Sequence, residues 1–120
     1  MPVRAIRGAT QVDRNDRDAV LEATAELVRA VLDRNAIDTA DLISVIFTAT
    51  PDLTAEFPAY AARAIGITDV PFLCATEIDV PGAMPGVIRL LAHVESDRHR
   101  DEIRHVYLRG AGALRTDLPR

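Results

Sequence analysis

Apolar side chains recur at two different periods along this chain, and the two periods separate helices from strands. In residues 20–32 apolar positions return every three or four residues, and charged residues fill the opposite side. This predicts an amphipathic helix of about five turns that covers one sheet face, with Asn15 or Asp16 as its N-cap. In residues 88–95 one face is apolar throughout, and Arg89, Leu91, His93 and Glu95 alternate with it on the other face. This alternation predicts a half-buried strand.

Shorter runs supply the other predicted elements. We interpret residues 3–9, 43–49, 70–75 and 104–109 as strands, of which residues 43–49 are short, apolar and β-branched. Residues 57–65 form a predicted second helix, with Pro58 in its first turn and Gly66 as its C-cap. A short turn capped at Asp38 or Thr39 lies in the connector before the second strand.

The predicted order is strand, helix, strand, helix and then three strands, which is typical of an α/β fold with a mixed sheet. A length of 120 residues and a mass of 13.1 kDa leave room for one core, so we expect residues 1–120 to form a single domain. Two helices are few for a five-stranded sheet, and one face of it is expected to stay uncovered. Another chain is the obvious cover, which predicts an oligomer.

Composition narrows the class of ligand. The net charge is -4, the aromatic residues are three Phe and two Tyr, and all 14 cations are arginine. An acidic chain with few aromatic side chains lacks the features that bind nucleic acid. Apolar stretches fall well short of the roughly 18 residues of a membrane span. A single cysteine and the lack of a leader sequence at Met1 predict a cytoplasmic location.

Motifs for metal, phosphate or nucleotide binding are missing. The three histidines, His93, His99 and His105, are spaced six apart, which matches no common metal-ligand pattern, and Cys74 has no second cysteine to share a zinc ion. We therefore expect neither a metal nor a cofactor.

Four arginines lie inside or beside apolar elements. Arg7 shares a predicted strand face with apolar residues, Arg89 interrupts an apolar strand, Arg63 lies on a helix of alanines, and Arg115 follows an apolar pair. Each alone is more typical of a solvated charge. Together they favour a site for a substrate with several carboxylates, because the guanidinium fork matches carboxylate geometry. Composition and spacing leave the reaction open.

Five ordered motifs resemble those of the small monofunctional α/β class of chorismate mutases. The matching segments are residues 4–10 (RAIRGAT), residues 49–53 (ATPDL) with 57–59 (FPA), residues 70–71 with Cys74, Glu77, 81–82 and 88–89, residues 104–108 (RHVYL), and residues 114–115 with 117–118. They extend from residue 4 to residue 118 at near-constant spacing, which makes the resemblance specific.

The resemblance implies the rearrangement of chorismate to prephenate, on the shikimate route to phenylalanine and tyrosine. It also implies a homotrimer of pseudo-barrel shape with sites between subunits. This unimolecular reaction needs no cofactor or nucleophile, in agreement with the missing motifs. It needs a compact substrate conformer and positive charge near the ether oxygen as the bond breaks.

The resemblance also implies roles for individual residues. Arg89 would contact the ether oxygen and a carboxylate, and Arg7 and Tyr107 would bind a neighbouring carboxylate. Glu77 and the Cys74 region would hold the ring hydroxyl. The remaining implied contacts are Ala75 and Thr76 beside Cys74, the walls Phe57, Leu73 and Leu114, and Arg63 and Arg115, which would guide or close over the dianion. Tyr60 departs from the family because many relatives carry a charged residue there, often lysine.

Two other functions are compatible with the sequence besides that of a chorismate mutase. One is a trimeric carboxylate-binding or imino-acid deaminase-like module, which would need one arginine and no combination of Glu77, Arg7 and Arg89. The other is a non-catalytic sensor of an aromatic amino acid or a pathway intermediate. Loss of chorismate absorbance on adding the protein would separate the three.

Overall fold

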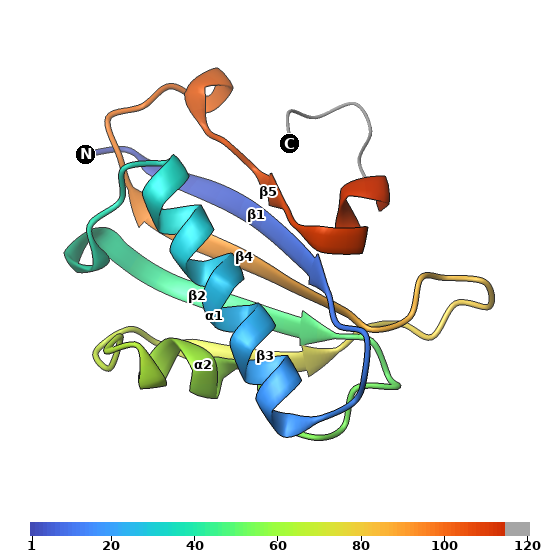
Figure 1. Ribbon diagram of the computed structural model, residues 1–120. Coiled ribbons are helices and arrows are strands. Elements are labelled where there is room, and N and C mark those ends of the chain that lie inside the picture. Colours follow the sequence, from blue (N-terminus) through green and yellow to red (C-terminus); the bar gives the residue numbers. More distant parts are fainter. Residues whose placement is uncertain (115–120) are drawn as a thin grey trace.

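A five-stranded mixed sheet with the order β3-β2-β4-β1-β5 forms the centre of the computed structural model, which describes residues 1–114 (Figure 1). The strands are β1 (Val3–Gln11), β2 (Leu42–Ala49), β3 (Phe72–Thr76), β4 (Val87–Glu95) and β5 (Val106–Tyr107). Strand β4 runs antiparallel to β1 and β2, whereas the pairs β2–β3 and β1–β5 are parallel. The predicted α/β fold with a five-stranded mixed sheet is confirmed.

Both helices, α1 (Arg17–Arg34) and α2 (Ala59–Ala64), lie on the same side of this sheet (Figure 1). The carboxylate of Asp16 accepts a hydrogen bond of 3.1 Å from the Ala19 N–H, so Asp16 is the N-cap of α1. Three short 3₁₀ turns complete the described elements: η1 (Thr39–Asp41), capped by Asp38, η2 (Arg100–Glu102) and η3 (Arg109–Leu114).

The core lies between the helices and one face of the sheet. Ile6, Phe47 and Leu90 point into it from three adjacent strands and pack against Leu27 and Val31 of α1. Alternation then places their strand neighbours on the opposite face. Among the described residues, η3 at the β1–β5 edge is the element that packs on that opposite face, through Ala111 and Leu114. We call this face the open face.

Several element boundaries differ from the sequence prediction, including those of the last strand, of β3 and of the second helix. The last strand is confined to residues 106–107, because the side chain of Asn35 takes both backbone groups of Arg104 at 2.8 and 2.9 Å. Strand β3 begins at Phe72, after Pro71, which has no N–H to donate. The second helix begins at Ala59, and Pro58 is its N-cap rather than a residue of its first turn.

Candidate active site

An ion pair between Arg89 and Glu77 lies on the open face of the sheet. The Arg89 Nε donates to both carboxylate oxygens of Glu77, at 3.0 Å to Oε2 and 3.2 Å to Oε1. The Glu77 side chain is 15% exposed and the Arg89 side chain 44%. The arginine that interrupts an apolar strand therefore meets an anion within its own chain.

The strand β2 holds Glu77 at two points. The backbone N–H of Glu77 donates to the Ala49 carbonyl at 2.9 Å, and the Thr48 hydroxyl donates to Glu77 Oε2 at 2.6 Å. Thr48 is directly opposite Arg89 in the β2–β4 register. Glu77, which follows the end of β3, is thus held against β2 on the open face.

Arg7 lies on the same face, one strand away from Arg89. It is paired with Leu91 in the antiparallel β1–β4 register, while Arg89 is paired with Ala9. Arg7 and Arg89 are therefore diagonal neighbours, whose Cα atoms are typically roughly 7–8 Å apart in such a pair. Arg7 is exposed and borders a groove of about 460 Å³ together with His93, Arg100 and His105. Two guanidinium groups therefore lie on one face of the sheet in an otherwise acidic protein, one of them paired with Glu77.

Tyr107 and Leu114 are brought to the far end of the same strip. Tyr107 pairs with Ala9 in the parallel β1–β5 register and is 7% exposed. It packs with Ala9, Ala111 and Leu114 in one cluster. The cross-strand row thus runs from Thr48 through Arg89 and Ala9 to Tyr107.

A second group of predicted site residues lies around α2. Phe57 is 63% exposed, its ring meets that of Tyr60 edge-on at 6.0 Å, and the Arg63 guanidinium lies over the Tyr60 ring at 5.5 Å. We call these three residues the α2 cluster. A groove of about 420 Å³ beside it is bordered by Phe57, Cys74, Ala75 and Thr76. Glu56 borders the same groove, and the Phe57 N–H together with Arg17 lowers the pKa of its carboxyl below the ordinary value.

The predicted residues therefore fall into two groups on one chain. Arg7, Glu77, Arg89, Tyr107 and Leu114 lie on the open face, as does Leu73, which is 61% exposed on the edge strand β3. Phe57, Arg63 and the Cys74 groove lie toward α2, which packs on the opposite face. Arg115 lies outside the described residues.

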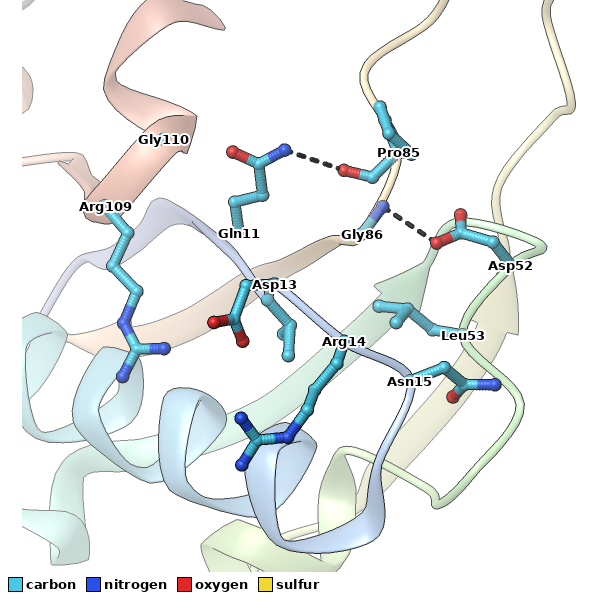
Figure 2. Close-up of a pocket in the computed structure, with 11 residues that line it drawn as sticks. Gln11, Asp13, Arg14, Asn15, Asp52, Leu53, Pro85, Gly86, Arg109 and Gly110 are labelled. Atoms are coloured by element: carbon cyan, nitrogen blue, oxygen red, sulfur yellow. Dashed lines mark hydrogen bonds between the residues drawn. The ribbon is translucent and has the colours of Figure 1, made fainter.

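A pocket of about 620 Å³ does not coincide with either group (Figure 2). It lies where β1 leads into α1, beside η3, and Figure 2 shows it bordered by Arg14, Arg109 and Asp52. The Gln11 amide donates to the Pro85 carbonyl and the Gly86 N–H donates to the Asp52 carboxylate, both at 3.0 Å. These hydrogen bonds connect the end of β1 and the loop after β2 to the segment before β4. We therefore interpret this pocket as a space between connecting loops and not as a ligand site.

Thr48 and His105 contact predicted site residues, although neither was predicted to belong to the site. The ring Nδ1 of His105 accepts a hydrogen bond of 3.0 Å from the Arg7 N–H. Each has a trace in the sequence, since Thr48 is a hydroxyl near the end of an apolar strand and His105 adjoins the strand of Tyr107. Their partners, Glu77 and Arg7, are 29 and 98 residues away, and only the folded chain identifies them.

Two further features of the described residues bear on other kinds of function. Within residues 1–114, three or more His, Cys, Asp or Glu side chains do not gather in a group able to hold a metal ion. In the same part of the chain, helices of the length and apolar character needed to cross a membrane are absent.

Comparison with known proteins gives one consistent result. Residues 3–118 match the family model described as chorismate mutase type I. The chain is 50% identical over 117 residues to chorismate mutase AroH of Thermus thermophilus, covering 97% of this chain and 96% of that protein. It is 40% identical over 119 residues to chorismate mutase AroH of Bacillus subtilis (strain 168), with coverage of 98% and 94%. A solved chorismate mutase from Clostridium thermocellum superposes with a TM-score of 0.91 at 44% identity, covering 92% of this chain and 98% of that one.

Proposed function

The chain belongs to the type I chorismate mutase family and acts as a chorismate mutase, and we propose that the residues of its open face carry out the reaction. The observation that supports this assignment is the contact of Glu77 with both Thr48 and Arg89, with Arg7 diagonal to Arg89. The deaminase-like alternative needs one arginine and gives no reason for this combination.

In the proposed mechanism the protein supplies geometry and charge. Conversion of chorismate to prephenate breaks one carbon–oxygen bond and forms one carbon–carbon bond in a single molecule, so no proton or leaving group has to be taken up. The ether oxygen gains negative charge as its bond breaks, and a positioned cation stabilises that charge. Arginine suits this task because it stays protonated in a site from which water is excluded.

The two arginines would divide the contacts to the substrate. Glu77 contacts Arg89 through Nε, so the two terminal nitrogens of the guanidinium remain available for the ether oxygen and a carboxylate. Arg7, with Tyr107 near it, would bind the neighbouring carboxylate. Glu77 would accept the ring hydroxyl through Oε1, since Oε2 already takes the Thr48 hydroxyl. These contacts would also hold the compact conformer in which the reacting carbons meet.

We further propose that the site is completed in a homotrimer of pseudo-barrel shape. The α2 cluster belongs to a helix that packs on the face of the sheet opposite to Arg89, and a neighbouring chain could present its own cluster to the open face. Leu73 and Ile78 are 61% and 87% exposed, and apolar side chains at this edge favour a protein partner. A single free cysteine is compatible with a cytoplasmic location.

The assignment is tested by adding the purified protein to chorismate and following the loss of its absorbance and the appearance of prephenate. We expect catalysis by the natural protein and a large loss for Arg89→Ala. Arg29→Ala is the matched control, because Arg29 is exposed on the outer side of α1. A rate no higher than that of uncatalysed chorismate would contradict the function. Equal activity of the two variants would contradict the placement of the site.

A further inference from the structure

We propose that Thr48 is a positioning residue for the rearrangement, acting through Glu77 on Arg89. This inference rests on the proposed roles of Glu77 and Arg89. Its basis is the hydrogen bond of 2.6 Å from the Thr48 hydroxyl to Glu77 Oε2, the same oxygen that lies 3.0 Å from Arg89 Nε.

The contact is short because its acceptor is charged. Hydroxyl-to-carboxylate hydrogen bonds of this length are roughly twice as strong as those between neutral groups. The Glu77 side chain is 15% exposed, so water competes weakly for the same oxygen. Threonine is β-branched and has few accessible rotamers, which keeps its hydroxyl at a fixed place on β2.

Thr48 and Ala49 together determine where the carboxylate stands. Glu77 follows the last residue of β3, and its N–H is bound by the Ala49 carbonyl at 2.9 Å. This contact fixes the backbone but leaves the side chain free to rotate. The Thr48 hydroxyl removes that freedom, and it does so directly opposite Arg89 in the β2–β4 register.

The arrangement of the guanidinium depends on this contact. A carboxylate that holds Nε orients the planar fork, and the two terminal nitrogens then point in a set direction. Without the Thr48 hydroxyl, Glu77 can rotate, and Arg89 loses its orientation although its charge remains. Because the charge on the ether oxygen develops only as the bond breaks, the loss falls mainly on kcat rather than on KM.

The experiment compares Thr48→Val, which keeps the shape and removes the donor, with Thr48→Ser, which keeps the donor. A hydrogen bond to a charged group is worth enough to change a rate by about 10-fold, so we expect kcat of Thr48→Val to fall about 10-fold while KM changes less than about two-fold. Thr48→Ser should restore most of kcat. Thr48→Ala supplies a second variant without the donor, should Thr48→Val fold poorly.

A double-mutant cycle separates positioning from a general structural role. In the background of Glu77→Ala, Thr48→Val should change kcat less than about two-fold, because the group through which it acts is gone. The matched control is Thr10→Val on β1, whose hydroxyl is buried without a hydrogen-bond partner in the described structure. It should leave kcat unchanged.

Three results would overturn the proposal: full kcat in Thr48→Val, no rescue by Thr48→Ser, or an undiminished effect in the Glu77→Ala background. If Glu77→Ala and Arg89→Ala themselves kept full activity, the site assignment would fail, and the role of Thr48 with it. If those two variants lost activity and Thr48→Val did not, only the role of Thr48 would be wrong.

Discussion

Arg89 occupies a position where its charge needs a partner. It follows two fully buried residues, Val87 and Ile88, and precedes Leu90. Glu77 supplies the partner in the folded chain, at 3.0 Å. A cation that is already oriented by an anion does not have to be reorganised when the transition state forms, which is the condition for strong electrostatic catalysis.

Replacement of Arg89 by citrulline tests whether charge or shape carries the rate. Citrulline keeps the planar shape and much of the hydrogen bonding of arginine, but it is neutral. We expect it to lose about 10²–10³ in kcat, comparable to the removal of a preorganised donor, and Arg89→Lys to recover only part of the natural rate. Steady-state kinetics on chorismate gives the answer. A near-normal kcat with citrulline would mean that conformer selection by the pocket carries the rate.

Cys74 is expected to matter by shape and not as a thiolate. It is half-buried, it is paired with Phe47 across the parallel β2–β3 register, and it packs against the main core. Cys74→Ser changes its volume little, so we expect kcat to stay within about three-fold of the natural value. The measurement is kcat of Cys74→Ser beside the natural protein. A loss of several orders of magnitude would show that the thiol takes part in the chemistry.

At the scale of elements, Asn35 joins the end of α1 to the segment that leads into β5. Asn35 is 1% exposed, and its side chain donates to the carbonyls of Val31 and Arg104 at 2.9 Å and accepts from the Arg104 N–H at 2.8 Å. β5 is only two residues long, and it carries Tyr107. The position of Tyr107 therefore depends on a side chain located 72 residues earlier in the chain.

Asn35→Ala tests this contact. Removing the amide leaves backbone groups of Arg104 without partners in a part-buried place, and we expect the free energy of unfolding to fall by about 2–4 kcal/mol in urea titration. The control is Asn15→Ala, which removes hydrogen bonds to Thr54 and Ala55 at an exposed site. Water can replace those contacts, so a decrease of less than about 1 kcal/mol is expected. Equal losses at the two positions would contradict the argument from burial.

The elements that sequence patterns predicted well are those governed by local periodicity. The helix α1 and the strand β4 were predictable because each buries one continuous face, at a period of 3.6 or 2. The bounds of β5 were not predictable, because the side chain of Asn35 takes up both backbone groups of Arg104. Among the site residues, Arg7 and Arg89 were identified as charges out of place in apolar strands. The bond between Thr48 and Glu77 depends on the alignment of β3 beside β2, which the sequence alone does not show.

At the scale of the whole molecule, the described chain is thin. Its extents are 39 × 33 × 20 Å, and the smallest of them corresponds to one sheet and one layer of helices. A layer of either kind is roughly 10 Å thick, so a second helical layer has no place among the described residues. The open face, with Arg7 and Arg89 on it, is thus a property of the architecture, and a neighbouring chain is the cover that we expect.

Mixing two inactive variants tests whether the site is shared between chains. We expect Arg89→Ala to remove the open-face half of the site and Arg63→Ala to damage the half that the α2 cluster provides, so each alone should have low activity. In a trimer with a site at each boundary, one chain contributes the open face and its neighbour contributes the α2 cluster. After random reassembly of equal amounts, each half of a site is unsubstituted in about half of the cases, so about a quarter of the sites carry neither substitution. Activity should therefore rise to about a quarter of the natural value after the mixture is unfolded and refolded together. Light scattering on the same samples should report three chains per particle rather than a monomer of 13.1 kDa.

The control is to refold the two variants separately and mix them afterwards, which should give no gain. Absence of any gain after joint refolding, in particles that are trimers, would place both arginines in a site built by one chain.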